Sequence, residues 1–168
     1  MSFPRTLRDF AIFNEGEFIG EGDMARLPKI AYKTEEWIGG GMAAPVEIRD
    51  HLEKMDCEWE TKGFLELPFK QMGSERLGSI GLRFVGAYYQ SDSGTVDSVE
   101  VEIRGTHKEV EGGQLKRGEH NSTKVMSTLT TYKLSVNGAE LIFIDALNGI
   151  ERYDGKDIRS PLREAIGL

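Results

Sequence analysis

Gly112-Gly113-Gln114-Leu115-Lys116-Arg117-Gly118-Glu119 leads into the uninterrupted run Ser122–Val136, which reaches Asn137-Gly138 and returns as Ala139–Asp145. Asn-Gly between two apolar extended segments predicts a hairpin, because both turn positions of a type I′ turn need a positive φ. The returning segment is apolar on both faces, which indicates burial on both sides. The outgoing segment would span roughly 50 Å as a strand, and we expect part of that length to meet another subunit.

The composition predicts one soluble domain over residues 1–168, since 168 residues can bury a core of their own. No apolar run is long enough to cross a membrane, and the charged segment Met1–Phe10 does not resemble a signal peptide. We therefore expect synthesis in a cytoplasm. The net charge of −7 argues against specific nucleic-acid binding, because such binding depends on cations that neutralise phosphates.

The rest of the chain indicates a mainly β protein. Strands are expected at Leu7–Asn14, Met24–Trp37 with a break at Pro28, Val46–Ile48, Lys54–Thr61, Gly78–Gln90, Ser98–Arg104 and Ile150–Tyr153. Helices are expected at Leu65–Met72 and Pro161–Ile166, the second with Ser160 as its N-cap. The fold class is an antiparallel β-sandwich or barrel with one outer helix and a short C-terminal helix.

The residue types do not indicate an enzyme. The histidines His51, His107 and His120 show no metal-ligand spacing, and we expect them to lie on the surface. Cys57 alternates with charged residues in a strand pattern, which predicts a buried, inert thiol. No nucleophile motif or phosphate loop occurs, so neither a cofactor nor a metal is expected.

Several segments, taken in order and spacing, resemble the major tail tube proteins of contractile-tail bacteriophages, most closely the tube of R-type pyocins. The segments that carry the resemblance are Pro4–Leu7, Phe13–Gly16, Leu27–Ile30, Gly39–Val46, Leu115–Glu119, Tyr132–Gly138, Ile142–Asp145 and Arg163–Leu168. The resemblance implies a structural subunit that forms stacked homohexameric rings around a lumen. It also implies sheath, baseplate and tail terminator proteins as partners, in an extracellular particle released by lysis.

Within that resemblance the two Gly-bearing loops are expected at subunit interfaces, because neither has a buried apolar pattern. Their residues are Gly39, Gly40, Gly41, Met42 and Pro45, then Gln114, Leu115, Lys116, Arg117 and Glu119. The polar side of the alternating strand is expected to face the lumen with an acidic balance, through Ser98, Glu100, Glu102 and Arg104. Arg163 and Glu164 of the last helix are expected to face the sheath.

Two other functions remain open on the sequence alone. A secretion-system tube subunit would share the fold and the hexameric ring. A monomeric small-ligand β-barrel would need an enclosed apolar cavity instead.

Overall fold

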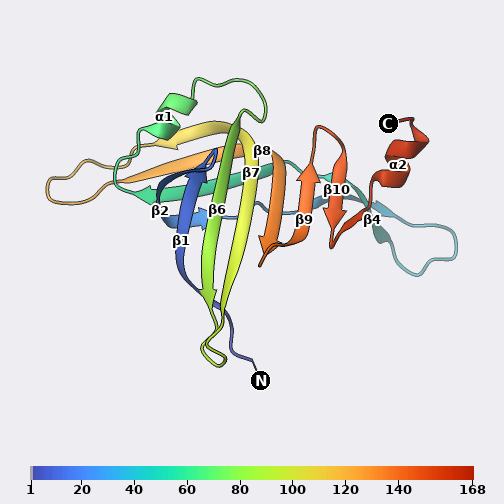
Figure 1. The fold of residues 1–168 in the computed structure, drawn as a ribbon. Coiled ribbons are helices and arrows are strands. Elements are labelled where there is room, and N and C mark those ends of the chain that lie inside the picture. The colour runs from blue at the N-terminus through green and yellow to red at the C-terminus, as the bar shows by residue number, and fades with distance from the viewer. Residues whose placement is uncertain (1) are drawn as a thin grey trace.

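The structure, a computed structural model, describes residues 2–168, with side chains for all of them except Glu21. The chain forms β strands and two short helices (Figure 1). The elements are β1 (Thr6–Asn14), β2 (Glu17–Arg26), β3 (Tyr32–Trp37), β4 (Val46–Leu52), β5 (Met55–Lys62), α1 (Leu67–Gln71), β6 (Ile80–Tyr89), β7 (Val96–Glu111), β8 (Ser122–Val136), β9 (Ala139–Asp145), β10 (Ile150–Tyr153), β11 (Lys156–Asp157) and α2 (Ser160–Ala165). The mainly β, antiparallel fold class is confirmed.

The main sheet closes into a barrel and continues beyond it. The strand order is β11-β10-β9-β8-β5-β2-β1-β6-β7, and β7 pairs back with β8. The strands β8, β5, β2, β1, β6 and β7 therefore form a closed barrel, and β9, β10 and β11 extend the sheet outward from β8. Closure satisfies the backbone edges that an open sheet would expose.

The long strand β8 is covered within the chain. One edge pairs with β7 from Val99↔Val136 to Glu111↔Lys124. The other edge pairs with β5 over residues 122–129 and with β9 over residues 131–136. Both backbone edges of β8 are therefore hydrogen-bonded within the chain, which leaves no free edge for strand pairing with another subunit. The expectation that part of this strand meets another subunit through its side chains stays a prediction.

The change of partner occurs at Thr130, which lies outside both pairings. Thr130 donates its hydroxyl to the carbonyl of Arg104 (3.3 Å), and its own carbonyl accepts the amide of Ala146 (2.9 Å). The facing strand β7 has an irregularity between Arg104 and Gly105 at the same level. Such bulges bend a strand, and here the bend lets β8 pair with β5 before Thr130 and with β9 after it.

The barrel interior is filled by apolar side chains. The fully buried core includes Ile12, Cys57, Trp59, Val125 and Ile144. Burial raises the pKa of the Cys57 thiol to about 12, which keeps it protonated and unreactive as predicted. In β9, Ile144 faces this core, but Leu141 is 41% exposed, so the predicted burial of both faces of β9 is not found in the single chain.

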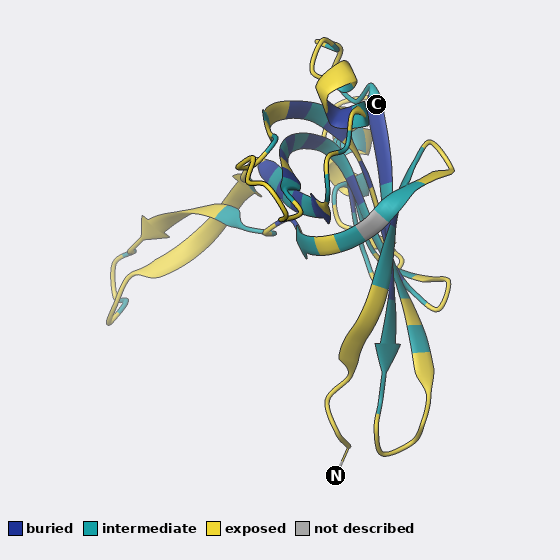
Figure 2. Cartoon of the chain, turned by 90° about the vertical axis from the view of Figure 1, so that its left-hand side faces the viewer, coloured by how far each residue is buried: buried dark blue, intermediate teal, exposed yellow. Residues whose placement is uncertain are grey.

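The hairpin of β3 and β4 leaves the barrel as a separate two-stranded arm, residues 32–52. Its strands pair only with each other. Figure 2 shows the arm standing away from the barrel with mostly exposed residues. Pro28 lies in the connection before the arm, at the predicted break, and β4 is longer than the predicted strand.

The predicted turns and helices are found with local differences. Asn137 and Gly138 have φ of 50° and 83°, so the type I′ hairpin is confirmed. The first helix, α1, is shorter than predicted, whereas α2 has the predicted length but begins one residue earlier, so Ser160 is not its N-cap. That position belongs to Arg159, which has no side-chain cap bond, because Ser160 already lies in the helix and donates to Glu164 Oε1 (3.4 Å).

His107 is buried, contrary to the prediction of a surface histidine, whereas His51 and His120 are exposed. Its Nδ1 lies 2.8 Å from Ser127 Oγ and its Nε2 lies 2.8 Å from Gln71 Oε1, which ties β7 to β8 and α1. Burial lowers the pKa of His107 to about 4. In the neutral imidazole, Nε2–H donates to Gln71 Oε1 and Nδ1 accepts from the Ser127 hydroxyl. In the charged form both nitrogens donate, so the Ser127 hydroxyl would have to turn and accept.

The first prediction concerns the close approach at the strand bend. A Cβ at Gly105 would overlap the carbonyl oxygen of Thr128, which is backbone and cannot rotate away. Gly105→Ala should lower the free energy of unfolding by about 2 kcal/mol, measured by urea denaturation. Gly20→Ala is the control, because nothing lies within 4 Å of a Cβ there. Equal stabilities for the two variants would contradict this account.

The second prediction concerns pH. The folded state holds the His107 pKa at about 4, below its unfolded value near 6.5. The unfolded chain then binds more protons between these values, so this contribution is full above pH 6.5 and is lost as pH falls to 4. We expect a loss of about 3 kcal/mol in unfolding free energy over this range. His107→Gln should flatten the dependence and His120→Gln should not, and identical pH profiles would exclude His107 as its source.

Candidate assembly surfaces

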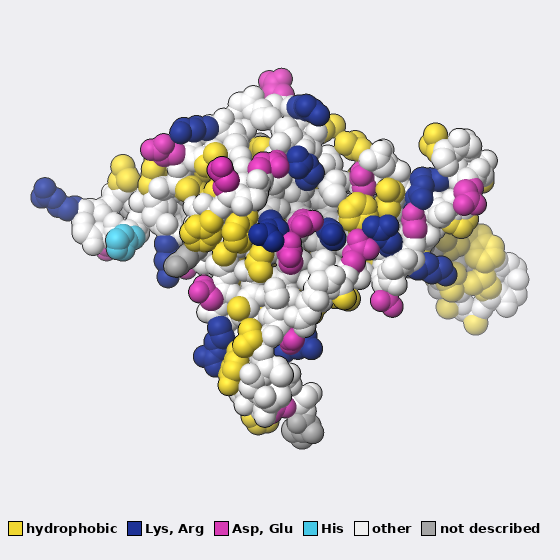
Figure 3. Space-filling view, in the orientation of Figure 1, with side chains coloured by type: hydrophobic (Ala, Val, Ile, Leu, Met, Phe, Trp, Pro, Cys, Tyr) yellow, Lys and Arg dark blue, Asp and Glu magenta, His cyan; other side chains and the backbone are white. Residues whose placement is uncertain are grey.

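The arm carries an apolar face that nothing in the chain covers. Trp37 pairs with Val46 in the strand register, and Ile48 lies two residues further along β4 on the same face. These side chains are 55%, 47% and 52% exposed respectively. Figure 3 shows hydrophobic side chains covering the end of the arm. An isolated two-stranded ribbon is marginally stable in water, so this arm is suited to packing against another surface.

The predicted interface loop Gly39–Pro45 forms the tip of this arm. Gly41 has φ +87°, and the amide of Met42 donates to the carbonyl of Gly39 (3.2 Å) in a tight turn. The Gly39 amide lies 3.1 Å from the Met42 sulfur. The loop therefore has a defined internal shape and projects beyond the barrel. Its contact with another subunit stays a prediction.

A polar cluster fixes the base of the arm. The Tyr32 hydroxyl lies 2.7 Å from Glu151 Oε2 and 2.8 Å from the Tyr153 hydroxyl, and the guanidinium of Arg49 lies 3.5 Å from the centre of the Tyr32 ring. Glu151 is only 6% exposed and is also 3.6 Å from Arg159. Burial, together with these neighbours, raises the pKa of Tyr32 well above its usual value, so its hydroxyl stays protonated. The cluster joins β3 of the arm to β10 of the barrel sheet.

The second predicted interface loop, Glu111–Glu119, falls mostly in the connection 112–121 between β7 and β8. This connection projects from the end of the molecule opposite the arm (Figure 1). Asn121 Nδ2 donates to the carbonyl of Gly112 (2.9 Å) and closes the loop at its base. Leu115 is 86% exposed, and Lys116 pairs with Glu119 (2.9 Å). Gln114 and Arg117 are also exposed. Figure 3 shows basic side chains at the tip of this loop.

The residues predicted to line the lumen share one face of β7, as their spacing required. Val101 and Ile103 are buried on the opposite face. Glu100 pairs with Arg83 of β6 (3.2 Å), and Glu102 lies 3.9 Å from Lys133 of β8. Neighbouring strands therefore supply a cation beside each of these carboxylates, and the acidic balance predicted for the lumen stays a prediction. Whether the face lines a lumen stays a prediction.

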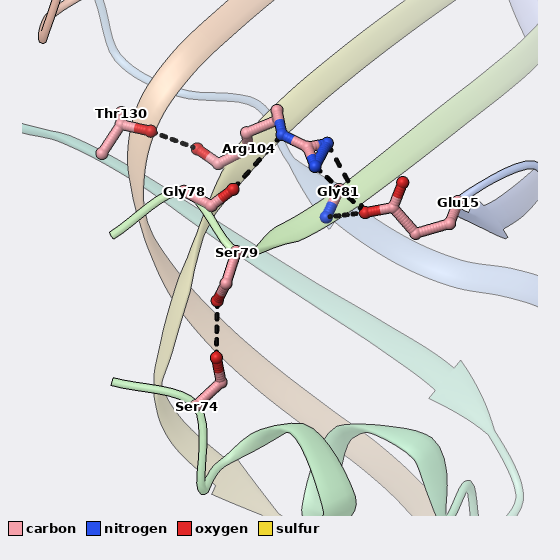
Figure 4. Close-up of polar contacts among 7 residues, drawn as sticks. All are labelled: Glu15, Ser74, Gly78, Ser79, Gly81, Arg104 and Thr130. Atoms are coloured by element: carbon pink, nitrogen blue, oxygen red, sulfur yellow. Dashed lines mark hydrogen bonds and ion pairs between the residues drawn. The ribbon is translucent and has the colours of Figure 1, made fainter. Parts of the chain in front are cut away.

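Arg104, the fourth residue of that set, is held by contacts within the chain (Figure 4). Its Nη2 lies 3.2 Å from Glu15 Oε1, and its Nε donates to the carbonyl of Gly78 (3.2 Å). The same Glu15 oxygen accepts the amide of Gly81 (3.1 Å). Arg104 therefore connects the β1–β2 turn to the segment that enters β6, and Ser98 is the member of the set with a free, exposed side chain.

The two residues of α2 predicted to face the sheath differ in their surroundings. Arg163 Nη2 lies 2.6 Å from Asp157 Oδ2, and its Nη1 donates to the carbonyl of Gly149 (2.8 Å). Arg163 thus anchors α2 to the end of the sheet, whereas Glu164 is exposed. The outward face of the helix is instead apolar, with Leu162 58% and Ile166 72% exposed.

Two further surfaces were missed by the sequence reasoning. Residues 6–10 of β1 pair with β6 on one side, but their other edge has no partner strand in the described part of the chain. Beside α1, the rings of Phe64 and Phe69 stack at 5.4 Å and remain exposed by 61% and 40%.

The described residues contain no group of three or more His, Cys, Asp or Glu arranged to hold a metal ion. Among the helices of residues 2–168, none has the length and apolarity that crossing a bilayer requires.

Comparison with known proteins gives consistent matches along the whole chain. Residues 4–167 match the family model described as phage tail tube protein FII. The tail tube protein of Escherichia phage P2 is 33% identical over 172 aligned positions, covering 100% of both chains. The major tail tube protein of Serratia phage KSP20 is 35% identical over 161 positions, covering 94% of this chain and 92% of its own. These relatives are phage proteins, so the closer likeness to the pyocin tube stays a prediction.

Solved structures with the same fold come from contractile injection systems. A subunit of the sheath–tube complex of the PVC extracellular contractile injection system has a TM-score of 0.60 at 12% identity, over 79% of this chain and 92% of that one. The tube-terminating cap of the anti-feeding prophage has a TM-score of 0.62 at 9% identity, over 80% and 93%. At such identities the likeness shows the fold alone. The full-length sequence matches show more: this chain belongs to the phage tail tube protein FII family.

Proposed function

We propose that this protein is the structural subunit of the inner tube of a contractile phage tail or pyocin, and that it assembles as stacked hexameric rings around a lumen. The observation that carries this is the arm of β3 and β4, whose apolar face is exposed and whose strands pair with nothing else in the described chain. A partner surface must cover that face for the arm to be stable.

The ends of the sheet support assembly in a closed ring. One end is the edge of β1 at residues 6–10, and the other is the two-residue strand β11 beside β10. The sheet between them runs through β6, β7, β8 and β9. These ends differ from one another, so copies would meet head to tail, and such a contact closes a ring when the rotation fits. The edges left unpaired in one chain would then be protected in the ring.

The proposed partners follow from this arrangement and from the neighbours' own descriptions. Sheath, terminator and tube proteins are named in the solved structures that share the fold. By analogy, the exterior of this tube would contact sheath and terminator proteins, and a baseplate would hold its end. The apolar outer face of α2 and the exposed Glu164 are available for a sheath contact.

The role is non-catalytic, and the subunit would be made in a bacterial cytoplasm before function in an extracellular particle. The family consists of structural tube proteins, and the interior of the barrel is filled by core side chains such as Trp59 and Val125. A filled barrel argues against the alternative of a small-ligand carrier, which needs an enclosed cavity. The secretion-system alternative is disfavoured because the sequence relatives reported above are phage proteins.

Electron microscopy of the purified protein tests the proposal. We expect six-fold rings and stacked tubes, with light scattering that rises above a critical concentration. A two-residue change on the arm, Trp37→Ser with Ile48→Ser, should abolish tubes while the barrel keeps its urea midpoint, because both side chains are exposed in the single chain. A protein that stays at 18.8 kDa at all concentrations would refute the proposed function.

Thiol labelling of assembled tubes tests which surfaces face inward. Cys57 is buried and does not react, so a single introduced cysteine reports its own position. Ser98→Cys should react with a small maleimide but not with a polymer-linked maleimide too large to enter the tube. Glu164→Cys, the control on the exterior, should react with both. If the large reagent labels Ser98→Cys along whole tubes, this face of β7 does not line the lumen.

A further inference from the structure

The arm has a second face, and it carries an unbalanced pair of charges. Glu36 of β3 and Glu47 of β4 are direct partners in the strand register, so their side chains lie side by side on the face opposite Trp37 and Val46. Both are exposed. Like charges placed directly opposite each other destabilise a strand pair. The arm therefore keeps a local cost that a cation from outside would remove.

The chain supplies no such cation to this pair. Among residues 2–168, neither Glu36 nor Glu47 has a Lys, Arg or His nitrogen within 4.0 Å in the recorded ion pairs. Arg49 lies next along the same face, but its guanidinium lies over the Tyr32 ring at the base of the arm. The cation must come from another molecule.

Few basic side chains on a second copy of the chain are free to neutralise Glu36 and Glu47. The basic residues without a recorded ion pair in the described chain are Arg8, Lys29, Lys33, Arg49, Lys54, Arg76, Arg117 and Lys156. Arg8 and Arg49 are stacked on tyrosine rings. Lys29, Lys33 and Lys54 belong to the arm or its flanks. Lys156 is the strand partner of Tyr153, whose hydroxyl contacts Tyr32 at the base of the arm. Arg76 and Arg117 remain.

Of these two, Arg117 is better placed. It lies on loop 112–121, which projects at the end of the molecule opposite the arm (Figure 1), whereas Arg76 lies in the connection between α1 and β6. The neighbouring Lys116 is already paired with Glu119, which leaves Arg117 free to reach outward. A planar guanidinium with five donors can bond two adjacent carboxylates at once.

We infer that Arg117 of one copy inserts against Glu36 and Glu47 of another, so that the acidic face of the arm is neutralised only in the assembled tube. The inference rests on the proposed function, because it names the partner of the arm as a second copy of this chain. The contact joins different surfaces from opposite ends of the molecule, so it is heterologous and can repeat without limit or close into a ring.

A charge exchange tests this contact. Glu36→Lys with Glu47→Lys replaces one like-charge pair on the arm by another, so the cross-strand repulsion within the single chain stays similar. The attraction of this face to Arg117 of another copy becomes repulsion. This variant and Arg117→Glu should each raise the critical concentration for assembly about tenfold or more. The three changes together should bring it back toward the wild-type value, because coupled residues are not additive. Critical concentrations are read by light scattering, with tubes confirmed by electron microscopy.

The matched control is Arg76→Glu, which makes the same charge change at another exposed arginine with no recorded ion pair. It should leave the critical concentration unchanged and should not rescue the arm variant. Rescue by Arg76→Glu in place of Arg117→Glu, or no rescue by either, would overturn the inference. Wild-type rings in that experiment would leave the proposed function standing, whereas absence of wild-type rings would refute the function itself.

Cross-linking gives a measurement that does not depend on the folding of the charge variants. Glu36→Cys protein mixed with Arg117→Cys protein should form a heterodimer with a short bismaleimide cross-linker, because the side chains of an Arg–Glu contact hold the two Cα atoms farther apart than the roughly 7 Å that a direct disulfide can bridge. Buried Cys57 does not compete. Each variant alone should give no dimer. A mixture that yields no heterodimer under conditions where wild-type tubes form would overturn the inference.

Discussion

The divided pairing of β8 is the constraint on which the rest of the fold depends. One edge follows β7 along nearly the whole strand, while the other changes from β5 to β9 at Thr130. A single strand can do this only if it bends, and the bend needs a close approach between β7 and β8 at Gly105, where any side chain would meet the Thr128 carbonyl. The barrel and its lateral extension are joined through this point.

The same closure determines which surfaces are left for assembly. A closed barrel has few open backbone edges, so a tube cannot grow by adding strands to its middle. What remains is the edge of β1 at residues 6–10, the short end at β11, the arm of β3 and β4, and loop 112–121. These lie at different ends of the molecule, which favours head-to-tail contacts over isologous ones.

The exposed carboxylates of β7 and of the arm differ in whether a neighbouring strand of the same chain supplies a cation. On the exposed face of β7, Glu100 and Glu102 meet Arg83 and Lys133 from adjacent strands, so that face is balanced in the single molecule. On the arm, which has only two strands, Glu36 and Glu47 have no third strand to supply a cation. The difference follows from topology, since cross-strand pairing can balance a charge only where a neighbouring strand is present.

The sequence by itself determined the local elements whose signals are confined to neighbouring residues. The Asn137-Gly138 turn, the length of β8 and the alternation of Val101 and Ile103 all follow from backbone preference and period-two burial. The end-to-end similarity also indicated the family, because several short segments in a fixed order and spacing are specific together, although each segment alone is a weak signal. The class of fold was therefore accessible before any coordinates.

Only the tertiary structure decided how those elements meet. It buried His107 against Gln71 and Ser127, tied Arg104 to Glu15, and joined Arg163 to Asp157, although each of these looked like a surface residue along the chain. It also covered β8 on both edges and left the arm uncovered. Sequence patterning reports the period of burial along one segment, whereas these contacts join residues whose distance in the sequence carries no such period.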